Sequence, residues 1–439
     1  MAYAAAPRLP PSLRCAPTLP LAGWALAVPA QPVLRTLGYS DKLTSMPTIK
    51  ALVSRTLGST QHRIFGLDLL RAVAIFITVY GHAVMLVPPA YRSWHNLPVS
   101  AIDGVNIFFV LSGYLIGGIL LKALLDARKP FALGHFWMRR WLRTLPAYLV
   151  VLSSVVAVAA GQRKLPTEVW HYFCFSQNLM APHPAFFPEG WSLAVEEWFY
   201  LLFPLVVLVL AGLTRSRRVA MAGTIALFLT LPLVFKYYQY QQGKGLDAAL
   251  WDGYYRRVVA ARLDAIALGV LACYLQHYHA GLWRGLRRPG LGLAAGLLVV
   301  TFLYPKLGPN VLFYNVWLRP LLEGFTVLLV LPFFSQLRRP HYTPAMRALT
   351  LLSLISYSMY LLNKSVLIKL VLEPLEKSVF TPHLGSGGWL VAYALYWLLL
   401  LVSALLLYTY VEVPFMKLRE VFEKPKRATS TPELATTRQ

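Results

Sequence analysis

Apolar residues occur in ten long runs along the chain, and short polar segments separate one run from the next. Each run is long enough, or nearly long enough, to cross about 30 Å of hydrocarbon as a helix. The pattern predicts an all-α fold, a polytopic transmembrane helical bundle of about ten spans. The predicted spans cover residues 67–87, 102–121, 145–160, 193–213, 219–238, 258–275, 290–304, 316–334, 349–372 and 389–411.

Composition narrows the class of protein. Hydrophobic residues make up 57% of the 439 residues and charged residues 14%, which excludes a soluble domain of this length. The net charge of +24 would suit a nucleic-acid-binding protein, but no groove-reading or stacking motif accompanies it. The basic residues instead form short clusters between apolar runs. We therefore expect a multi-pass protein of the lipid bilayer that does not bind nucleic acid.

The basic clusters also predict the orientation of the spans. Arginine and lysine gather in every second connection and in the C-terminal tail. Because cytoplasmic loops carry an excess of these residues, both termini are predicted to be cytoplasmic. The first span then runs outward and the fourth runs inward.

The ends of the chain differ from the membrane region. Residues 1–60 are rich in Ala, Pro, Leu and Arg, and we interpret them as a disordered extension or as sequence upstream of a true start at Met46. A signal or transit peptide is a further reading of this stretch. The membrane domain is expected over residues 61–415, and a disordered cytoplasmic tail over 416–439. Three scattered cysteines predict neither a disulfide framework nor a metal site.

Ionisable residues inside the first span are the strongest functional signal. Asp68, Arg71 and His82 lie among aliphatic neighbours, although a charge near the bilayer centre costs about 2.5 to 3.5 kcal/mol. Arg71 and His82 are eleven residues apart, which places them on nearly the same helix face and about 16 Å apart along the axis. One stripe of one helix therefore presents a fixed cation and a titratable imidazole.

Counting depth along each predicted span groups the polar residues at two levels. Arg71 lies near the cytoplasmic side with Arg140 and Arg143, a cationic cluster suited to phosphates. His82 lies nearer the outer side, where a carboxylate could assist proton transfer. The other residues expected near this outer level are Asn106, Trp191, Glu196, Arg262, Asp264, Tyr360 and Asn363. A coenzyme A thioester, with phosphates at one end and an acyl group at the other, would join the two levels.

Six motifs along the chain together resemble the acyltransferase-3 family of integral-membrane acyltransferases. They are Gly66 to His82 (an Arg-x10-His element), Asp103 to Ile116, Phe136 to Tyr148 with its Arg-x-x-Arg element, Trp191 to Glu196, Arg262 to Asp264, and Tyr410 to Phe415. The resemblance implies acyl-CoA, often acetyl-CoA, as co-substrate, with no bound cofactor. It also implies a hydroxyl acceptor on an extracytoplasmic glycan, lipid-linked sugar or secreted metabolite, at a bacterial inner membrane.

We predict that His82 is the general base for the acceptor hydroxyl and that Glu196 orients its imidazole or stabilises the imidazolium. Arg71, Arg140 and Arg143 are the predicted donor-binding residues. An acyl-histidine intermediate is a variant of this mechanism. Two positions depart from the family pattern, since Asn106 replaces the usual Asp and Asn363 the usual His.

Structural roles compete with these functional ones. His82 could be a buried structural histidine, and Arg71 could form an ion pair with Asp68 on the same helix. A charge pair is the alternative for Arg262 and Asp264, and close helix packing for Ser112. At the level of the whole protein, a glycan or lipid transporter or flippase is the competing class. A scaffold with degenerate motifs is a third reading.

Overall fold

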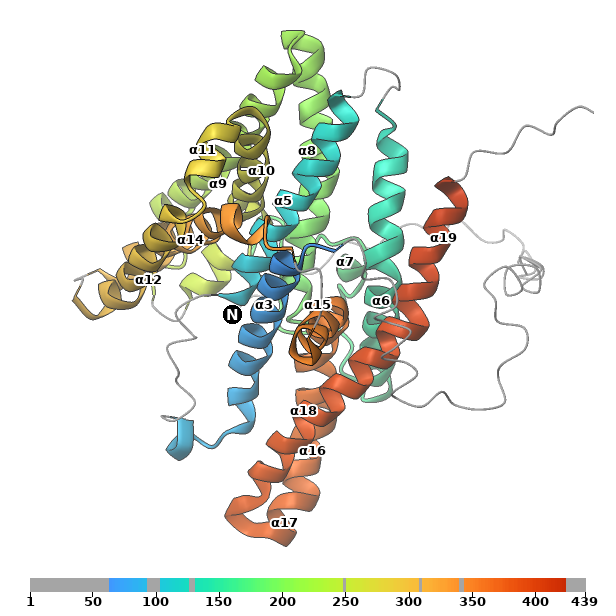
Figure 1. The fold of residues 1–439 in the computed structure, drawn as a ribbon. Helices are drawn as coiled ribbons and strands as arrows, with labels where there is room; N and C mark the ends of the chain where they lie inside the picture. The colour runs from blue at the N-terminus through green and yellow to red at the C-terminus, as the bar shows by residue number, and fades with distance from the viewer. Residues whose placement is uncertain are drawn as a thin grey trace, which may run out of the picture. The chain divides into compact units, whose positions relative to one another are not determined.

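The computed structural model describes residues 63–92, 103–125, 131–247, 250–307, 310–338 and 343–423. Regular structure within these ranges is entirely helical, with no strand among them (Figure 1). The predicted N-terminal extension, the candidate start at Met46 and residues 424–439 lie outside the described ranges. The predicted all-α class is confirmed.

Nine helical segments of the described chain are long and apolar enough to cross a membrane. They contain the helices α3 (Phe65–Ala83), α5 (Gly104–Leu125), α6 (Leu133–Gly161), α8 (Gly190–Thr214), α9 (Arg217–Gln241), α12 (Pro289–Leu307), α14 (Arg319–Phe334), α15 (Pro344–Leu362) and α18 (Gly388–Leu407). They match nine of the ten predicted spans. The remaining predicted span, residues 258–275, corresponds to α10 (Leu263–Tyr278), which has only 16 residues.

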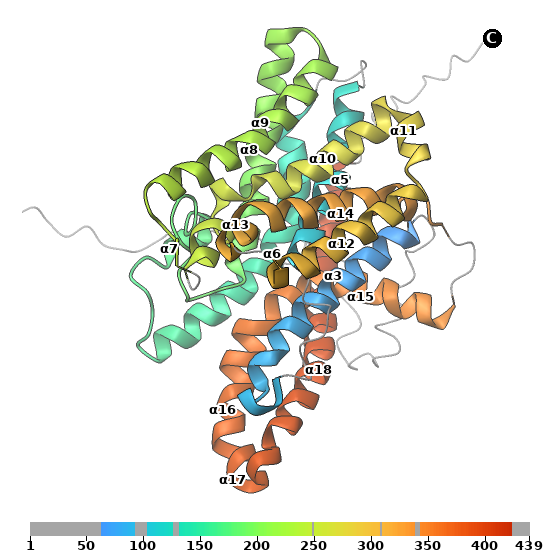
Figure 2. The ribbon, with the colours of Figure 1, turned by 90° about the vertical axis from the view of Figure 1, so that its left-hand side faces the viewer.

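Helix α10 lies inside the bundle, where it packs against α5, α9 and α14. Sixteen residues give a length of about 24 Å, which is short for a full span. Two glycines allow α10 to cross α5 at backbone contact, because a Cβ at Gly113 would overlap the carbonyl oxygen of Ile266 and one at Gly269 would overlap that of Val110. The two helices lie side by side in both views (Figures 1 and 2). Gly113 therefore serves close helix packing.

Helix α3 carries Arg71 and His82 and packs against α5 and α15. At Asn363 the chain of α15 continues into the π-helical segment η7 (Asn363–Leu372). A π-helical turn widens the helix and is frequent at functional sites. The side chain of Asn363, at this transition, contacts His82 of α3.

Two predicted boundaries were wrong. Helix α6 begins at Leu133, so Arg140 and Arg143 belong to its first turns rather than to a loop before residue 145. The predicted membrane domain ends at residue 415, but α19 (Val413–Glu423) continues as a helix through the first part of the predicted tail. Its predicted disordered portion therefore includes eight helical residues, 416–423. The predicted cytoplasmic orientation of the termini stays a prediction.

Candidate active site

The imidazole of His82 is held by the amide of Asn363. His82 Nδ1 lies 2.5 Å from Asn363 Oδ1, and the Asn363 side chain is completely buried. The amide nitrogen of Asn363 donates to the carbonyl oxygens of Tyr360, at 2.5 Å, and Met359, at 3.3 Å. The residue that departs from the family pattern is therefore the direct partner of His82.

These bonds determine which nitrogen of His82 carries a proton. Carbonyl oxygens only accept hydrogen bonds, so the NH2 group of Asn363 must face Tyr360 and Met359 and its oxygen must face His82. An oxygen acceptor requires an N–H donor, so Nδ1 is protonated in the neutral ring. Nε2 then keeps its lone pair, the arrangement that a general base needs.

The carboxylate of Glu189, which sequence reasoning missed, binds the first turn of η7. Glu189 precedes α8 and is 2% exposed. Its Oε1 accepts from the backbone nitrogens of Lys364, at 3.1 Å, and Ser365, at 2.5 Å, and its Oε2 accepts from the Ser365 hydroxyl at 2.5 Å. Burial raises the pKa of Glu189 above its ordinary value, although the bonds from Ser365 oppose this shift. Glu189 thereby fixes the start of η7, next to Asn363.

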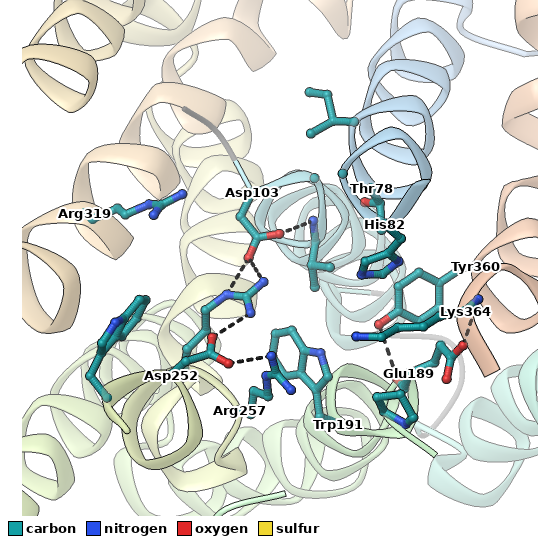
Figure 3. A pocket seen from close by; sticks show the side chains of 17 residues that line it. Thr78, His82, Asp103, Glu189, Trp191, Asp252, Arg257, Arg319, Tyr360 and Lys364 are labelled. Carbon is teal, nitrogen blue, oxygen red and sulfur yellow. Dashed lines mark hydrogen bonds and ion pairs between the residues drawn. The ribbon is translucent and has the colours of Figure 1, made fainter. Parts of the chain in front are cut away.

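His82 lines a cavity of about 330 Å³, called here the His82 cavity (Figure 3). Charged side chains from five parts of the fold surround it. They are Asp103, Glu189, Asp252, Arg256, Arg257, Arg319 and Lys364. Trp191 and Tyr360 form part of the wall. The cavity is therefore polar, large enough for part of a sugar-sized molecule, and in contact with the imidazole.

An ion-pair network forms one side of the His82 cavity. Arg256 donates to Asp103 at 2.6 Å and to Asp252 at 2.9 Å, and Arg257 pairs with Asp252 at 2.5 Å. Burial alone would raise the pKa of Asp103, but the charge and hydrogen bonds of Arg256 lower it below its ordinary value. The Arg256 guanidinium also lies over the ring of Trp191, 5.1 Å from the centroid. The network links Asp103, at the start of α5, to residues 252–257.

The three predicted donor-binding arginines line a second cavity of about 400 Å³, called here the Arg71 cavity. Arg71 reaches it from α3, and Arg140 and Arg143 from α6. Arg140 Nε is buried without a hydrogen-bond partner among the described residues, and its guanidinium lies 4.2 Å from the ring centroid of Tyr200. The structure thus brings together three cations that lie up to 72 positions apart in the sequence. Such a cluster suits a phosphate-bearing ligand.

The two cavities share the side chains of Tyr360 and Val105 as lining residues. The Tyr360 hydroxyl lies 2.5 Å from Ser192 Oγ and donates to the Glu189 carbonyl oxygen at 3.2 Å. Tyr360 therefore stands between the arginine cluster and His82. The predicted arginine cluster and His82 thus line two adjoining cavities, while their depth in the membrane stays a prediction.

The predicted contact between Glu196 and His82 is wrong. Glu196 lines the Arg71 cavity, and so does Ser112, whose hydroxyl bonds to the hydroxyl of Tyr200. Depth counting failed here because the carboxylate of this segment that lines the His82 cavity is Glu189, seven residues earlier, which is about 10 Å back along the chain. Glu189 lies between Pro188 and the Trp191 motif. Its position two residues before this motif is the sequence signal that could have identified it as a site residue.

Several other predicted site residues form a buried polar network instead of lining the cavities. The amide of Asn106 donates to Glu323 and accepts from Arg262, and Glu323 pairs with Arg319 at 2.7 Å. Asp264 pairs with Lys236 at 2.9 Å, so Arg262 and Asp264 do not form the charge pair considered from sequence.

Asp68 is likewise structural. Its carboxylate accepts from Arg63 and from the Ser353 hydroxyl, at 2.8 Å, which ties α3 to α15. The alternative in which Asp68 pairs with Arg71 is therefore not the arrangement observed. No group of three or more His, Cys, Asp or Glu side chains suited to a metal ion occurs within the described ranges.

The fold and the site define a polytopic helical membrane protein whose interior holds a histidine between a cationic cavity and a mixed-charge cavity. A sequence model of the acyltransferase-3 family, described as an acyltransferase domain, matches residues 64–409. The chain belongs to this family and is an integral, multi-pass membrane protein.

Curated relatives carry names from one area of chemistry. A protein of Bacillus subtilis (strain 168), provisionally named peptidoglycan O-acetyltransferase YrhL, is 34% identical over 209 residues, which are 42% of this chain and 30% of the relative. Peptidoglycan O-acetyltransferase OatA of Listeria monocytogenes serovar 1/2a (strain ATCC BAA-679 / EGD-e) is 28% identical over 195 residues, 40% of this chain and 29% of the relative. The chain thus spans less than a third of the length of these relatives. No solved structure matches it.

Proposed function

We propose that this protein transfers an acyl group, in the first instance acetyl, from acyl-CoA to a hydroxyl of a glycan outside the cytoplasm. The observation that carries the proposal is the position of His82, whose Nδ1 is held by Asn363 while its ring borders a polar cavity next to an arginine cluster. Family membership and the O-acetyltransferase names of the relatives support the reaction class.

The Arg71 cavity is the proposed site for the phosphates of the donor. Three guanidinium groups provide fixed positive charge and paired N–H donors, the chemistry that recognises phosphate oxygens. Arg71 and His82 lie eleven residues apart on the continuous helix α3, a rise of about 16 Å. A donor whose phosphates bind at the arginines can extend its acyl end past Tyr360 toward His82.

His82 then acts as general base. Nε2 removes the proton from the acceptor hydroxyl while the oxygen attacks the thioester carbonyl. The tetrahedral intermediate collapses to an ester as the C–S bond breaks, and the imidazolium returns its proton to the departing thiolate. Asn363 accepts from Nδ1–H throughout, so it keeps the ring in the tautomer and orientation that the step requires. Direct transfer of this kind needs no acyl-enzyme intermediate.

The proposal can be tested with the full chain reconstituted in liposomes. Acetyl-CoA is supplied with soluble peptidoglycan strands, and mass spectrometry measures the gain of acetyl groups on the glycan. His82→Ala should abolish transfer, whereas His277→Ala, which alters an exposed histidine at the end of α10, should retain it.

Two results would contradict the proposal. Acetyl transfer by the His82→Ala protein at the wild-type rate would remove the general base from the mechanism. Passage of a glycan or lipid-linked sugar across the liposome membrane without acetylation, lost in the same variant, would establish the transporter class instead.

A further inference from the structure

The ammonium of Lys364 is a charged group of the His82 cavity that the proposed chemistry does not use. Lys364 directly follows Asn363, lines the cavity and lies beside Tyr360 (Figure 3). No hydrogen bond or ion pair to its Nζ is formed by any residue that the structure describes. A partly buried ammonium without a partner is unfavourable, so the position calls for a counter-charge.

The nearby carboxylates are already engaged by other donors. Glu189 accepts from two backbone nitrogens and a hydroxyl, all belonging to Lys364 and Ser365 but none to the lysine side chain. Asp103 and Asp252 accept from the guanidinium groups of Arg256 and Arg257. None of these carboxylates therefore forms an ion pair or hydrogen bond with the Lys364 ammonium.

A second cation of the same cavity also retains a free donor. Arg257 pairs with Asp252 through NH2, but its Nε is buried and has no hydrogen-bond partner among the described residues. An orphaned buried N–H is costly and is usually satisfied by a ligand or water. Lys364 and Arg257 come from different parts of the chain and line one cavity.

We infer that Lys364 and Arg257 bind an anionic group, a carboxylate or a phosphate, that the acceptor carries near the hydroxyl deprotonated by His82. This inference rests on the proposed acyl transfer and specifies its acceptor as an acidic glycan or a phosphate-bearing sugar. The same turn of η7 supplies both Asn363, which orients the base, and Lys364, which binds the anion. Binding of the anion therefore positions the acceptor relative to the base.

Binding of three matched trisaccharides to the full-length protein in detergent tests the inference. One probe is neutral N-acetylglucosamine trisaccharide, the second carries one lactyl ether carboxylate, and the third carries one phosphate at the reducing end. Affinities come from ligand-induced thermal stabilisation, and acetyl transfer to each probe is measured separately. Lys364→Met removes the ammonium, Lys364→Arg keeps the charge, and Lys369→Met is the control, since this lysine of η7 lines neither cavity.

At least one charged probe should bind about tenfold more tightly than the neutral one, and the tighter of the two identifies the anion. Lys364→Met should bring this ratio close to one, while Lys364→Arg and Lys369→Met preserve it. Equal affinity for all three probes, or an unchanged ratio in Lys364→Met, would overturn the inference. Selective binding without acetyl transfer to any probe would instead count against the proposed function and leave the anion site in place.

Discussion

Replacing Asn363 by leucine tests the claim that this amide prepares His82 for catalysis. Leucine has the same branching and the same number of side-chain heavy atoms but cannot accept a hydrogen bond, so Nδ1–H of His82 loses its partner at 2.5 Å. The imidazole becomes charged during proton transfer, and a buried hydrogen bond to a charged group contributes about 1.5 to 3 kcal/mol. We expect kcat to fall about 10- to 150-fold, the corresponding range in rate.

The KM for the acyl donor separates this effect from a general loss of structure. Asn363 does not line the Arg71 cavity, so the KM for acetyl-CoA should stay within about twofold of wild type. Steady-state acetyl transfer to soluble glycan, with thermal unfolding of the purified protein measured alongside, provides both numbers. Asn363→His introduces the side chain usual in the family, which can also accept from Nδ1–H, and should retain most of the activity.

An Asn363→Leu protein that folds normally and keeps kcat within twofold of wild type would refute the positioning role. A large increase in the KM for acetyl-CoA with unchanged kcat would also refute it, because the residue would then act on donor binding.

Three further predictions concern other parts of the molecule. Asn106→Asp, which introduces the family's usual residue, should lower the thermal stability by placing a carboxylate against Glu323, and adding Glu323→Gln should restore it; a stable single variant would exclude this pairing. Arg140→Gln should raise the KM for acetyl-CoA at least tenfold with little change in the KM for the glycan, whereas equal effects on both would argue against donor binding at the arginines. Burial lowers the pKa of His183 from its ordinary value to about 3. As the pH drops from about 6.5 toward 3, this histidine is therefore protonated in the unfolded chain but not in the folded protein, and the stability should fall. Thermal unfolding at pH 7 and pH 5 should show a smaller loss in His183→Gln, and an equal loss in both proteins would contradict the assignment.

The pattern of hydrophobic residues was sufficient to predict the fold class and nine of the ten spans. In lipid, a helix must form all of its backbone hydrogen bonds internally and remain apolar for about 20 residues. Helix α10 shows where this reasoning stops. Other helices surround α10 on several sides, so its length can be less than the thickness of the hydrocarbon layer. Its sequence is nevertheless as apolar as that of a membrane-spanning helix. The two glycines at its crossing with α5 have no local signal that distinguishes them from other glycines.

The site was predictable where it depends on one helix and less so where it depends on several. Arg71 and His82 follow from the spacing along α3, and the arginines of α6 from their Arg-x-x-Arg pattern. Glu196 was placed beside His82 because depth was counted from an approximate helix end, and an error of two turns moved it into the other cavity. Asn363 was expected at the level of His82, but its direct bond to the imidazole lies at the start of the π-helical segment η7, which no hydrophobic period reveals.

The shared wall between the cavities has a consequence for the passage of water inside the protein. Along the line from the arginine cluster to His82, the side chains of Tyr360 and Val105 separate two polar spaces. The layer between the two cavities is thus a few side chains thick, whereas the hydrocarbon around the protein is about 30 Å thick. The hydrogen bonds of the Tyr360 hydroxyl to Ser192 and Glu189 keep the ring in place. A substitution that loosens this ring would therefore be expected to let water pass between the two cavities, a change separate from the loss of any catalytic group.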